Sequence, residues 1–238
     1  MDKLELRERI PITNQEKEIF RTLRTNIEFT GIENKVIAIT SCMPNDGKSF
    51  VSYQLACSFA ENGKKTLFID ADLRKSVFNQ RVNIHRSLKG LCHFLAGQIP
   101  FSDGIYETNE DFLYIMPIGA YPTTPTELLS KDRFAQMLSK LKQVFDYVII
   151  DTPPLGNVVD AAIIAKQCDA SILVVSSDTY SRKFVQKIHS HLKTANPNCL
   201  GIVLNKVNVQ NSYYGRYYGT YYGEYGKYGE RTDYDEDM

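Results

Sequence analysis

The run Gly47-Lys48-Ser49 has the residue types that bind phosphate and magnesium. It follows an apolar stretch at 36–40 and opens a helical pattern. Backbone N–H groups at such a turn can hold phosphates, the lysine can reach the terminal phosphates, and the serine hydroxyl can bind Mg²⁺. The first glycine of the ordinary motif is replaced by Cys42, and the run alone could be a chance helix cap. Its context therefore decides the interpretation.

Two further segments end apolar runs with carboxylates. Asp70 and Asp72 follow one such run, with Arg74 close behind, and Asp151 follows another. The carboxyl ends of parallel strands open at one edge of a sheet, which is also the edge of the phosphate loop. Each aspartate alone could cap a loop, but three together beside a Gly-Lys-Ser turn predict a magnesium–nucleotide site. Arg74 either orients these carboxylates or pairs with them.

Apolar runs alternate with helical patterns, which predicts an α/β fold: a mostly parallel sheet with helices on both faces, as in P-loop NTPases. The predicted strands are 36–40, 67–70, 112–117, 147–151, 171–175 and 201–204. The predicted helices are 14–29, the stretch after the phosphate loop, 87–96, and one starting near Thr126, which would cap it.

Composition excludes several classes of function. Lys+Arg and Asp+Glu number 28 each, so no net charge attracts the chain to nucleic acid. Its five cysteines are scattered and form no C-x-x-C, which disfavours disulfides and a zinc site and fits a reducing cytoplasm. The longest apolar runs are far shorter than the roughly 20 residues of a membrane span. We therefore expect no direct membrane insertion.

The C-terminal segment is rich in tyrosine and glycine and lacks aliphatic residues, so we expect it to be disordered. Its tyrosines are Tyr213, Tyr214, Tyr217, Tyr218, Tyr221, Tyr222, Tyr225, Tyr228 and Tyr234. A Gly-rich segment of about 30 residues has an r.m.s. span near roughly 30 Å, enough to reach its own site or a neighbour's. The segment could be a low-complexity tail without chemistry. A nucleotide site on the same chain favours phosphorylation instead.

The loop 41–49, the run Asp-Ala-Asp-Leu-Arg at 70–74 and the run Asp-Thr-Pro-Pro at 151–154 resemble the Walker A, A′ and B motifs of the bacterial tyrosine kinases. These kinases accompany capsule and exopolysaccharide synthesis. The resemblance covers most of the chain and implies ATP and Mg²⁺ as cofactors. Two departures fall in the loop. Asn45 replaces a flexible glycine of the family's usual loop but tolerates a positive φ. Phe50 stands where that loop usually has a threonine, so a hydroxyl is lost there.

Site residues follow from the motifs and the resemblance together. The expected nucleotide-binding residues are Pro44, Asn45, Asp46, Gly47, Lys48, Ser49, Phe50 and Asn205. Asn205 would contact adenine, although a turn-forming Asn is an alternative. Lys48, Asp70 and Asp72 are the expected catalytic residues, and Asp70 is favoured over Asp72 as the base. Ser49, Asp72 and Asp151 would serve magnesium.

Glu18, Arg21 and Arg24 resemble the family's E-x-x-R-x-x-R oligomerisation motif, although a local Glu–Arg pair on one helix is the alternative. The resemblance implies a ring-like homo-oligomer with transfer in trans, a membrane activator protein with a cytoplasmic tail, and a cognate tyrosine phosphatase. The kinase would thus be cytoplasmic and recruited to the inner face of the membrane. We expect an N-terminal oligomerisation segment (1–34), a kinase domain (35–207) and the tail (208–238).

Two other classes share some of these features. Positioning and partition ATPases have the same sheet but usually carry a second lysine at the position of Met43, and they lack a tyrosine tail. A nucleotide-gated adaptor that regulates a polysaccharide polymerase or flippase is the non-enzymatic alternative. Phosphotyrosine formation from ATP separates the kinase from both.

Overall fold

The computed structural model describes residues 2–6, 11–78 and 87–208. The strands are β1 (Asp2–Leu4), β2 (Val36–Ser41), β3 (Thr66–Asp70), β4 (Tyr106–Thr108), β5 (Leu113–Met116), β6 (Tyr147–Asp151), β7 (Ala170–Ser176) and β8 (Cys199–Asn205). The helices are α1 (Asn14–Glu28), α2 (Lys48–Glu61), α4 (Leu91–Leu95), the 3-10 helix η1 (Phe101–Gly104), α5 (Pro125–Leu129), α6 (Asp132–Val144), α7 (Asp160–Ala165) and α8 (Arg182–Ala195).

In this part of the chain the strands form one sheet in the order β1-β4-β5-β3-β6-β2-β7-β8. The central strand β2 is parallel to β6 and β7, and Ile37 pairs with both Ile149 and Ala170. Among the described strands, only the β4–β5 pair is antiparallel. The predicted α/β class with a mostly parallel sheet is therefore confirmed. The ends of β2, β3 and β6 lie side by side at one edge.

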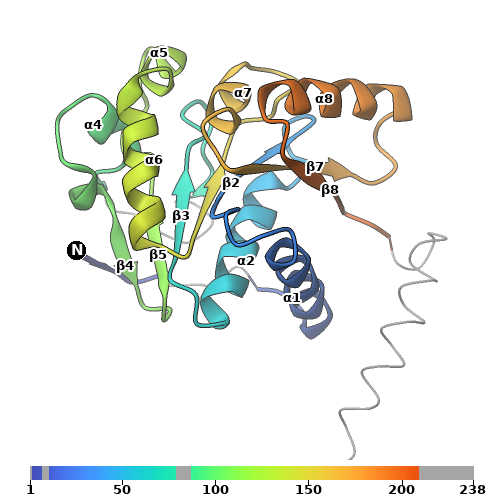
Figure 1. Ribbon diagram of the computed structural model, residues 1–238, viewed down its shortest axis with the longest axis horizontal. Coiled ribbons are helices and arrows are strands. Elements are labelled where there is room, and N and C mark those ends of the chain that lie inside the picture. The colour runs from blue at the N-terminus through green and yellow to red at the C-terminus, as the bar shows by residue number, and fades with distance from the viewer. Residues whose placement is uncertain (1, 7–10, 79–86, 209–238) are drawn as a thin grey trace, which may run out of the picture.

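Helices cover both faces of the sheet, as Figure 1 shows. One core lies beneath α1 and α2 and includes Ile37 and Ile39 of β2. The other lies beneath α4 to α8 and includes Val36 and Ala38 of the same strand. Because successive side chains of a strand point to opposite faces, a strand buried on both sides reads as a continuous apolar run. That is why the central strands were predictable.

The single helix predicted to start near Thr126 is wrong, because two helices occupy this stretch. Thr124 is the N-cap of α5, with Pro125 at the first helical position, where its missing N–H costs nothing. The chain then becomes extended at Lys131 (φ −74°, ψ 144°), and α6 starts at the next residue. The predicted strand 112–117 is confirmed as β5, whereas the helix predicted at 87–96 is described only as the shorter α4.

The N-terminal residues join the main fold. Strand β1, which the sequence pattern did not reveal, pairs with β4 at the edge of the sheet. Helix α1 begins as predicted and is fixed by a capping box, in which Thr13 and Glu16 bond each other's backbone N–H groups. It packs on α2. The proposed division of the chain at residue 34 stays a prediction.

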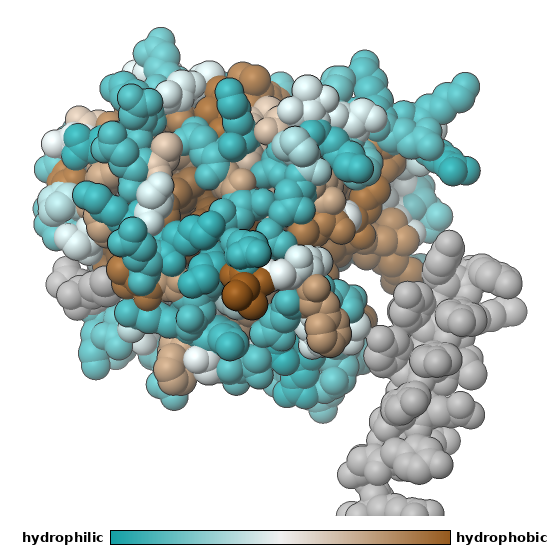
Figure 2. All heavy atoms as spheres, viewed as in Figure 1, coloured by the Kyte–Doolittle hydropathy of each residue, from teal (hydrophilic) through white to brown (hydrophobic). Residues whose placement is uncertain are grey.

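The opposite edge of the sheet is β8. Its Ile202 and Leu204 remain 46% and 48% exposed, and Figure 2 shows apolar surface beside this strand on an otherwise largely hydrophilic face. No helix within 2–6, 11–78 and 87–208 is both long and apolar enough to cross a membrane.

Candidate active site

The phosphate loop joins β2 to α2 through two residues with positive φ. Asn45 has φ 69° and Gly47 has φ 94°, and α2 begins directly afterwards at Lys48. Asparagine is one of the few residues with a side chain that adopts this conformation readily. Asn45 therefore takes the position of the flexible glycine without breaking the turn.

The end of β8 and the residue that follows it are fastened to this loop. The Asn205 amide donates to the Asp46 carbonyl over 2.8 Å, and Lys206 Nζ donates to the Asn45 carbonyl over 2.6 Å. A Cβ on Gly47 would lie only 2.0 Å from Asn205 Nδ2, so glycine is required there for packing as well as for its φ. Asn205 was expected to contact adenine, and in this structure its amide braces the loop.

Asp46 braces the loop from inside. Its carboxylate accepts from the Met43 N–H over 2.8 Å and from the Tyr180 hydroxyl over 2.7 Å. Burial together with this bond raises the pKa of Tyr180 above its usual range. The side chain of Asp46 thus supports the loop conformation, and its nucleotide contact stays a prediction.

Lys48 is held between two of the predicted aspartates. Its Nζ lies 2.9 Å from Asp72 Oδ2 and 3.9 Å from Asp151 Oδ1, and also bonds the Ser49 hydroxyl at 3.3 Å. Burial alone would lower the pKa of Lys48, but the charges of Asp151 and Asp72 raise it above its usual value. The ammonium therefore stays charged at the mouth of the loop, where a triphosphate needs a cation.

Asp70 lies deeper than Asp72. Its carboxylate accepts from the Ser76 hydroxyl and from the Asp72 N–H, and only 1% of the residue is exposed. Burial, with the charge of Asp151, raises the pKa of Asp70 to about 8. Asp151 is also buried and accepts from Ser52 over 3.3 Å. Three carboxylates thus converge behind Lys48, as the strand-end argument predicted.

A cavity of about 180 Å³ opens above this cluster. It is lined by Pro44, Asn45, Gly47, Lys48, Ser49, Asp72, Arg74, Lys75, Val77, Pro153, Pro154, Asn157 and Val158. Of the residues predicted to bind the nucleotide, to hold magnesium or to catalyse transfer, five are not part of this lining: Asp46, Phe50, Asp70, Asp151 and Asn205. The Phe50 ring points away to α1 and packs edge-on against Phe20, with ring centroids 5.8 Å apart.

Comparison with known proteins agrees with this geometry. A family model described as an AAA domain matches residues 34–202. Tyrosine-protein kinase CpsD of Streptococcus agalactiae is 44% identical over 215 residues, 90% of this chain and 90% of that protein. The kinase domain of the Escherichia coli tyrosine kinase ETK has a TM-score of 0.77 at 33% identity, over 83% of this chain and 80% of that one. The chain belongs to the bacterial tyrosine-protein kinases.

The positioning ATPases share this kinase's fold at lower identity. The septum site-determining protein MinD of Pyrococcus horikoshii, solved with Mg-ADP, has a TM-score of 0.64 at 26% identity, covering 73% of this chain and 71% of that one. The kinase has Met43 at the position where such ATPases usually carry a second lysine. The curated relatives that cover most of this chain are named tyrosine-protein kinases, and we therefore assign the chain a protein-tyrosine kinase activity.

The side chains of the kinase suit magnesium only together with a nucleotide. In the described part of the chain, no group of three or more His, Cys, Asp or Glu side chains could hold a metal alone. Mg²⁺ is usually bound through one or two carboxylates plus substrate phosphates and water. Ser49, Asp72 and Asp151, one hydroxyl and two carboxylates around the loop lysine, are the donors such a site requires.

Arg74 does not pair with the strand-end carboxylates, although the sequence allowed that. Its guanidinium bonds Asp160 at 2.6 and 3.1 Å and Thr126 Oγ1 at 2.9 Å. Asp160 also accepts from the Thr126 hydroxyl over 2.7 Å. Asp160 was not among the site residues predicted from the sequence of the kinase. The signal available was an aspartate opening an apolar helix shortly after the Asp-Thr-Pro-Pro run.

The predicted oligomerisation residues on α1 of the kinase separate into two groups. Glu18 and Arg21 form an ion pair on the exposed side of the helix. Arg24 turns to α2 instead, where its Nη1 donates to the Ser58 carbonyl over 2.7 Å and its side chain is 14% exposed. Thus Glu18 and Arg21 are accessible in the kinase, whereas Arg24 fastens α1 to the core.

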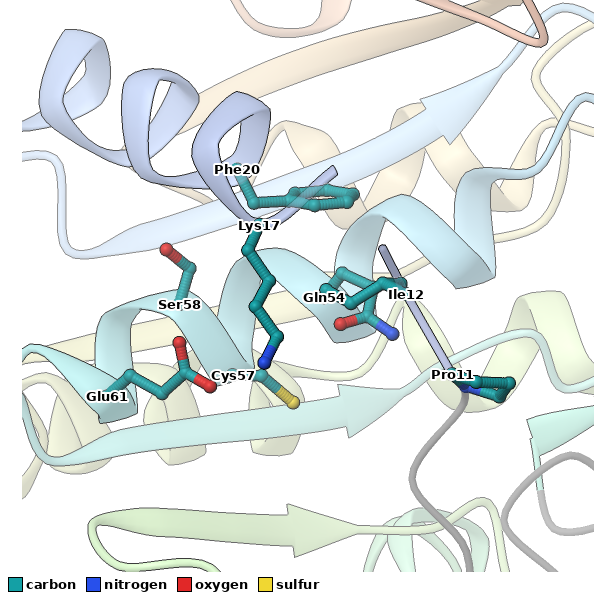
Figure 3. Close-up of a pocket in the computed structure, with 8 residues that line it drawn as sticks. All are labelled: Pro11, Ile12, Lys17, Phe20, Gln54, Cys57, Ser58 and Glu61. Carbon is teal, nitrogen blue, oxygen red and sulfur yellow. The ribbon is translucent and has the colours of Figure 1, made fainter. Parts of the chain in front are cut away.

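A second cavity of the kinase, about 200 Å³, lies between α1 and α2. It is lined by Pro11, Ile12, Lys17, Phe20, Gln54, Cys57, Ser58 and Glu61. Figure 3 shows Lys17 extending from α1 toward α2 beside Cys57 and Glu61. The phosphate-loop residues take no part in this lining, so this cavity is separate from the candidate active site.

The predicted acceptor tyrosines of the kinase lie outside the described residues. They are Tyr213, Tyr214, Tyr217, Tyr218, Tyr221, Tyr222, Tyr225, Tyr228 and Tyr234. Of the internal tyrosines, Tyr53 is fully buried, whereas Tyr121 is 60% exposed and donates its hydroxyl to the Ser76 carbonyl over 3.0 Å.

Proposed function

We propose that this kinase transfers the γ-phosphoryl group of ATP to the tyrosines of its own C-terminal segment, in trans within a homo-oligomer. The observation that carries the proposal is the contact of Lys206 with the Asn45 carbonyl at 2.6 Å. The predicted tail, residues 208–238, begins two residues after Lys206 in the sequence. A Gly-rich segment of about 30 residues has an r.m.s. span near roughly 30 Å, which would reach a neighbouring site within the same assembly.

The chemistry needs positioning and charge neutralisation. A tail tyrosine oxygen attacks the γ-phosphorus, the bond from that phosphorus to the β–γ bridging oxygen breaks, and ADP leaves. Lys48 neutralises charge on the transferring group from the start of α2, where backbone N–H groups also face the phosphates. The phenol proton passes to a carboxylate, for which we propose Asp70, whose Oδ2 accepts from the Ser76 hydroxyl. Because the pKa of Asp70 is raised to about 8, Asp70 acts as the base in its ionised form, whose fraction grows as the pH rises.

We further propose that Ser49, Asp72 and Asp151 hold Mg²⁺ on the nucleotide. When bound, the ion supplies charge that stabilises the phosphoryl oxygens. The nucleotide would contact Pro44, Asn45, Asp46, Gly47 and Phe50 of the loop, with Asn205 toward the base. MinD, which has the same fold, was solved with Mg-ADP, and this supports the same ligand class here.

The family resemblance suggests the setting of the reaction. We propose that the kinase regulates capsule or exopolysaccharide synthesis as part of a ring-like oligomer in the cytoplasm. A membrane activator protein with a cytoplasmic tail would recruit it to the inner face of the membrane, and a cognate tyrosine phosphatase would reverse the modification. A tail with half of its tyrosines phosphorylated would carry on the order of minus seven charges or more, because each phosphotyrosine adds about 1.5 to 2, and repulsion between such tails would favour dissociation.

Mixing two defective chains tests transfer in trans. A full-length Lys48→Met chain offers tyrosines without catalysis, and an active chain truncated after residue 208 offers catalysis without the tail. We expect phosphotyrosine on the Lys48→Met chain when both are incubated with Mg-ATP, and none when each is incubated alone. If the mixture stays unphosphorylated while the intact wild type reacts, transfer occurs in cis and this part of the proposal fails.

A further inference from the structure

A fully buried carboxylate outside the predicted site lies close to the cavity. Asp160 is the first residue of α7, and its side chain is 1% exposed. It receives the Arg74 Nε at 2.6 Å, the Arg74 Nη2 at 3.1 Å and the Thr126 hydroxyl at 2.7 Å. The two residues that supply these donors, Arg74 and Thr126, come from different segments of the chain.

Burying a carboxylate is costly unless charged partners satisfy it. Arg74 meets Asp160 with two nitrogens, the geometry that makes arginine–carboxylate pairs both strong and directional. The Arg74 side chain remains 41% exposed, and Arg74 lines the cavity. Asp160, the buried member of the pair, is therefore held in place, and Arg74, which it orients, lies at the cavity.

The orientation of Arg74 bears on Asp72. The backbone N–H groups of Arg74 and Lys75 approach Asp72 Oδ1 at 3.4 and 3.0 Å, and Asp72 Oδ2 bonds Lys48 at 2.9 Å. An uninterrupted path therefore runs from Asp160 through the Arg74 side chain and backbone to Asp72 and Lys48. If Arg74 is released, the turn that aims Asp72 into the cavity loses its anchor.

The same carboxylate connects the loop that follows β6. Pro154, Asn157 and Val158 line the cavity and lead into α7, where Asp160 lies. Thr126 brings in α5 from the other side. Asp160 thus joins two segments of the site. One is the turn after β3, which carries Asp72, and the other is the loop after β6, which follows Asp151.

We propose that Asp160 is a positioning residue for phosphoryl transfer. It acts through Arg74 to hold the Asp72 carboxylate in place beside Lys48 and Asp151. This proposal rests on the proposed role of Asp72 at the magnesium–nucleotide site. Asp160 itself does not touch the reacting groups. Its loss should slow the transfer step while leaving nucleotide capture by the phosphate loop intact.

The direct test replaces the carboxylate by an amide of the same shape. We expect Asp160→Asn to lower kcat about 10- to 100-fold, as for other residues that orient metal ligands, and to change KM for ATP by no more than about twofold. In the nucleotide-free protein, hydrogen exchange should rise in the peptide covering 71–78. Arg74→Gln should reproduce both effects, and Arg74→Lys should be intermediate because it keeps the charge without the two-nitrogen geometry.

Controls separate positioning from general stability. Asp169→Asn removes another ion-paired carboxylate, which contacts Lys142 and the N–H of Val36 at the start of β2, the end of that strand away from the phosphate loop, and should leave kcat and exchange at 71–78 unchanged. If Asp160→Asn does not fold, Arg74→Gln decides alone. Unchanged kcat and exchange at 71–78 in a folded Asp160 or Arg74 variant would overturn the proposal, as would a parallel loss in Asp169→Asn. Asp72→Asn should abolish transfer, and if it does not, the proposed site fails rather than this inference.

Discussion

The amide nitrogen of Asn205 fills the space that a side chain on Gly47 would need, 2.0 Å from where a Cβ would stand. The end of β8 thus packs against the phosphate loop at Gly47, directly before α2. Because Gly47 also has φ 94°, a substitution there is opposed by both the backbone and the packing.

Gly47→Ala should therefore abolish ATP binding and lower stability. Gly63→Ala is the matched control, because Gly63 has φ 72° but nothing lies within 4 Å of its Cβ position. That control should lose only the stability that a Cβ costs at a positive φ, about 1–2 kcal/mol, and should still bind nucleotide. Titration with a fluorescent ATP analogue and urea unfolding measure the two effects. Equal nucleotide affinity in both variants would contradict the packing argument.

Lys48→Met should reduce phosphotyrosine formation below detection, since the cation facing the phosphates is lost. It should also destabilise the nucleotide-free protein, because the buried carboxylates of Asp72 and Asp151 lose their partner. Lys140→Met, on the exposed side of α6, is the control and should change neither property. Thermal unfolding and a phosphotyrosine blot report on these two effects, and an unchanged melting temperature in Lys48→Met would speak against the buried ion pair.

The pKa of Asp70, raised to about 8 by burial, predicts a pH-dependent stability. Between about pH 4 and pH 8 the folded chain holds a proton on Asp70 that the unfolded chain has released. The contribution of this group to stability therefore falls as pH rises through that window. Asp70→Asn should remove the fall.

Urea unfolding of the nucleotide-free protein at pH 5 and at pH 8.5 measures this difference. We expect Asp70→Asn to gain stability relative to wild type at the higher pH by more than about 1 kcal/mol, since each unit of pKa shift corresponds to about 1.4 kcal/mol. Asp146→Asn serves as the control, because Asp146 accepts a backbone N–H at an exposed position near the other edge of the sheet. A stability difference that does not vary with pH would refute the raised pKa.

Substitutions of the exposed motif residues on α1 and of the largely buried Arg24 should have different effects, the first on assembly and the second on stability. Glu18→Lys with Arg21→Glu should weaken self-association without changing the melting temperature, because both side chains are exposed. Arg24→Ala should lower the melting temperature, because its bond to the Ser58 carbonyl is lost. Sizing columns and thermal unfolding separate these effects. An unchanged elution volume for the double variant would remove Glu18 and Arg21 from the interface.

The predictable part of the structure followed from local patterns. Ile37 and Ile149 are buried on central strands, whose two-sided burial produces apolar runs, and Lys48 and Asp72 meet because parallel strand ends share an edge. Contacts between distant side chains leave no such pattern. Arg74 and Asp160 are separated by 86 positions, and charge alone suggested nearer partners for Arg74.

The errors in secondary structure have a similar cause. The break between α5 and α6 at Lys131 interrupts a continuous helical periodicity, and the three-residue β1 is too short for strand alternation to show. Arg24 has the spacing of an exposed motif residue, but tertiary packing turns it to Ser58. In each case the three-dimensional contact overrides the local signal.

Intact-mass and peptide mass spectrometry of the full-length chain, incubated with Mg-ATP beside Lys48→Met, tests the central claim most directly. We predict that the wild-type chain gains several phosphates, all on tyrosines between 213 and 234, and that Lys48→Met gains none. A wild-type chain that hydrolyses ATP but carries no phosphotyrosine in this segment would contradict the proposed function.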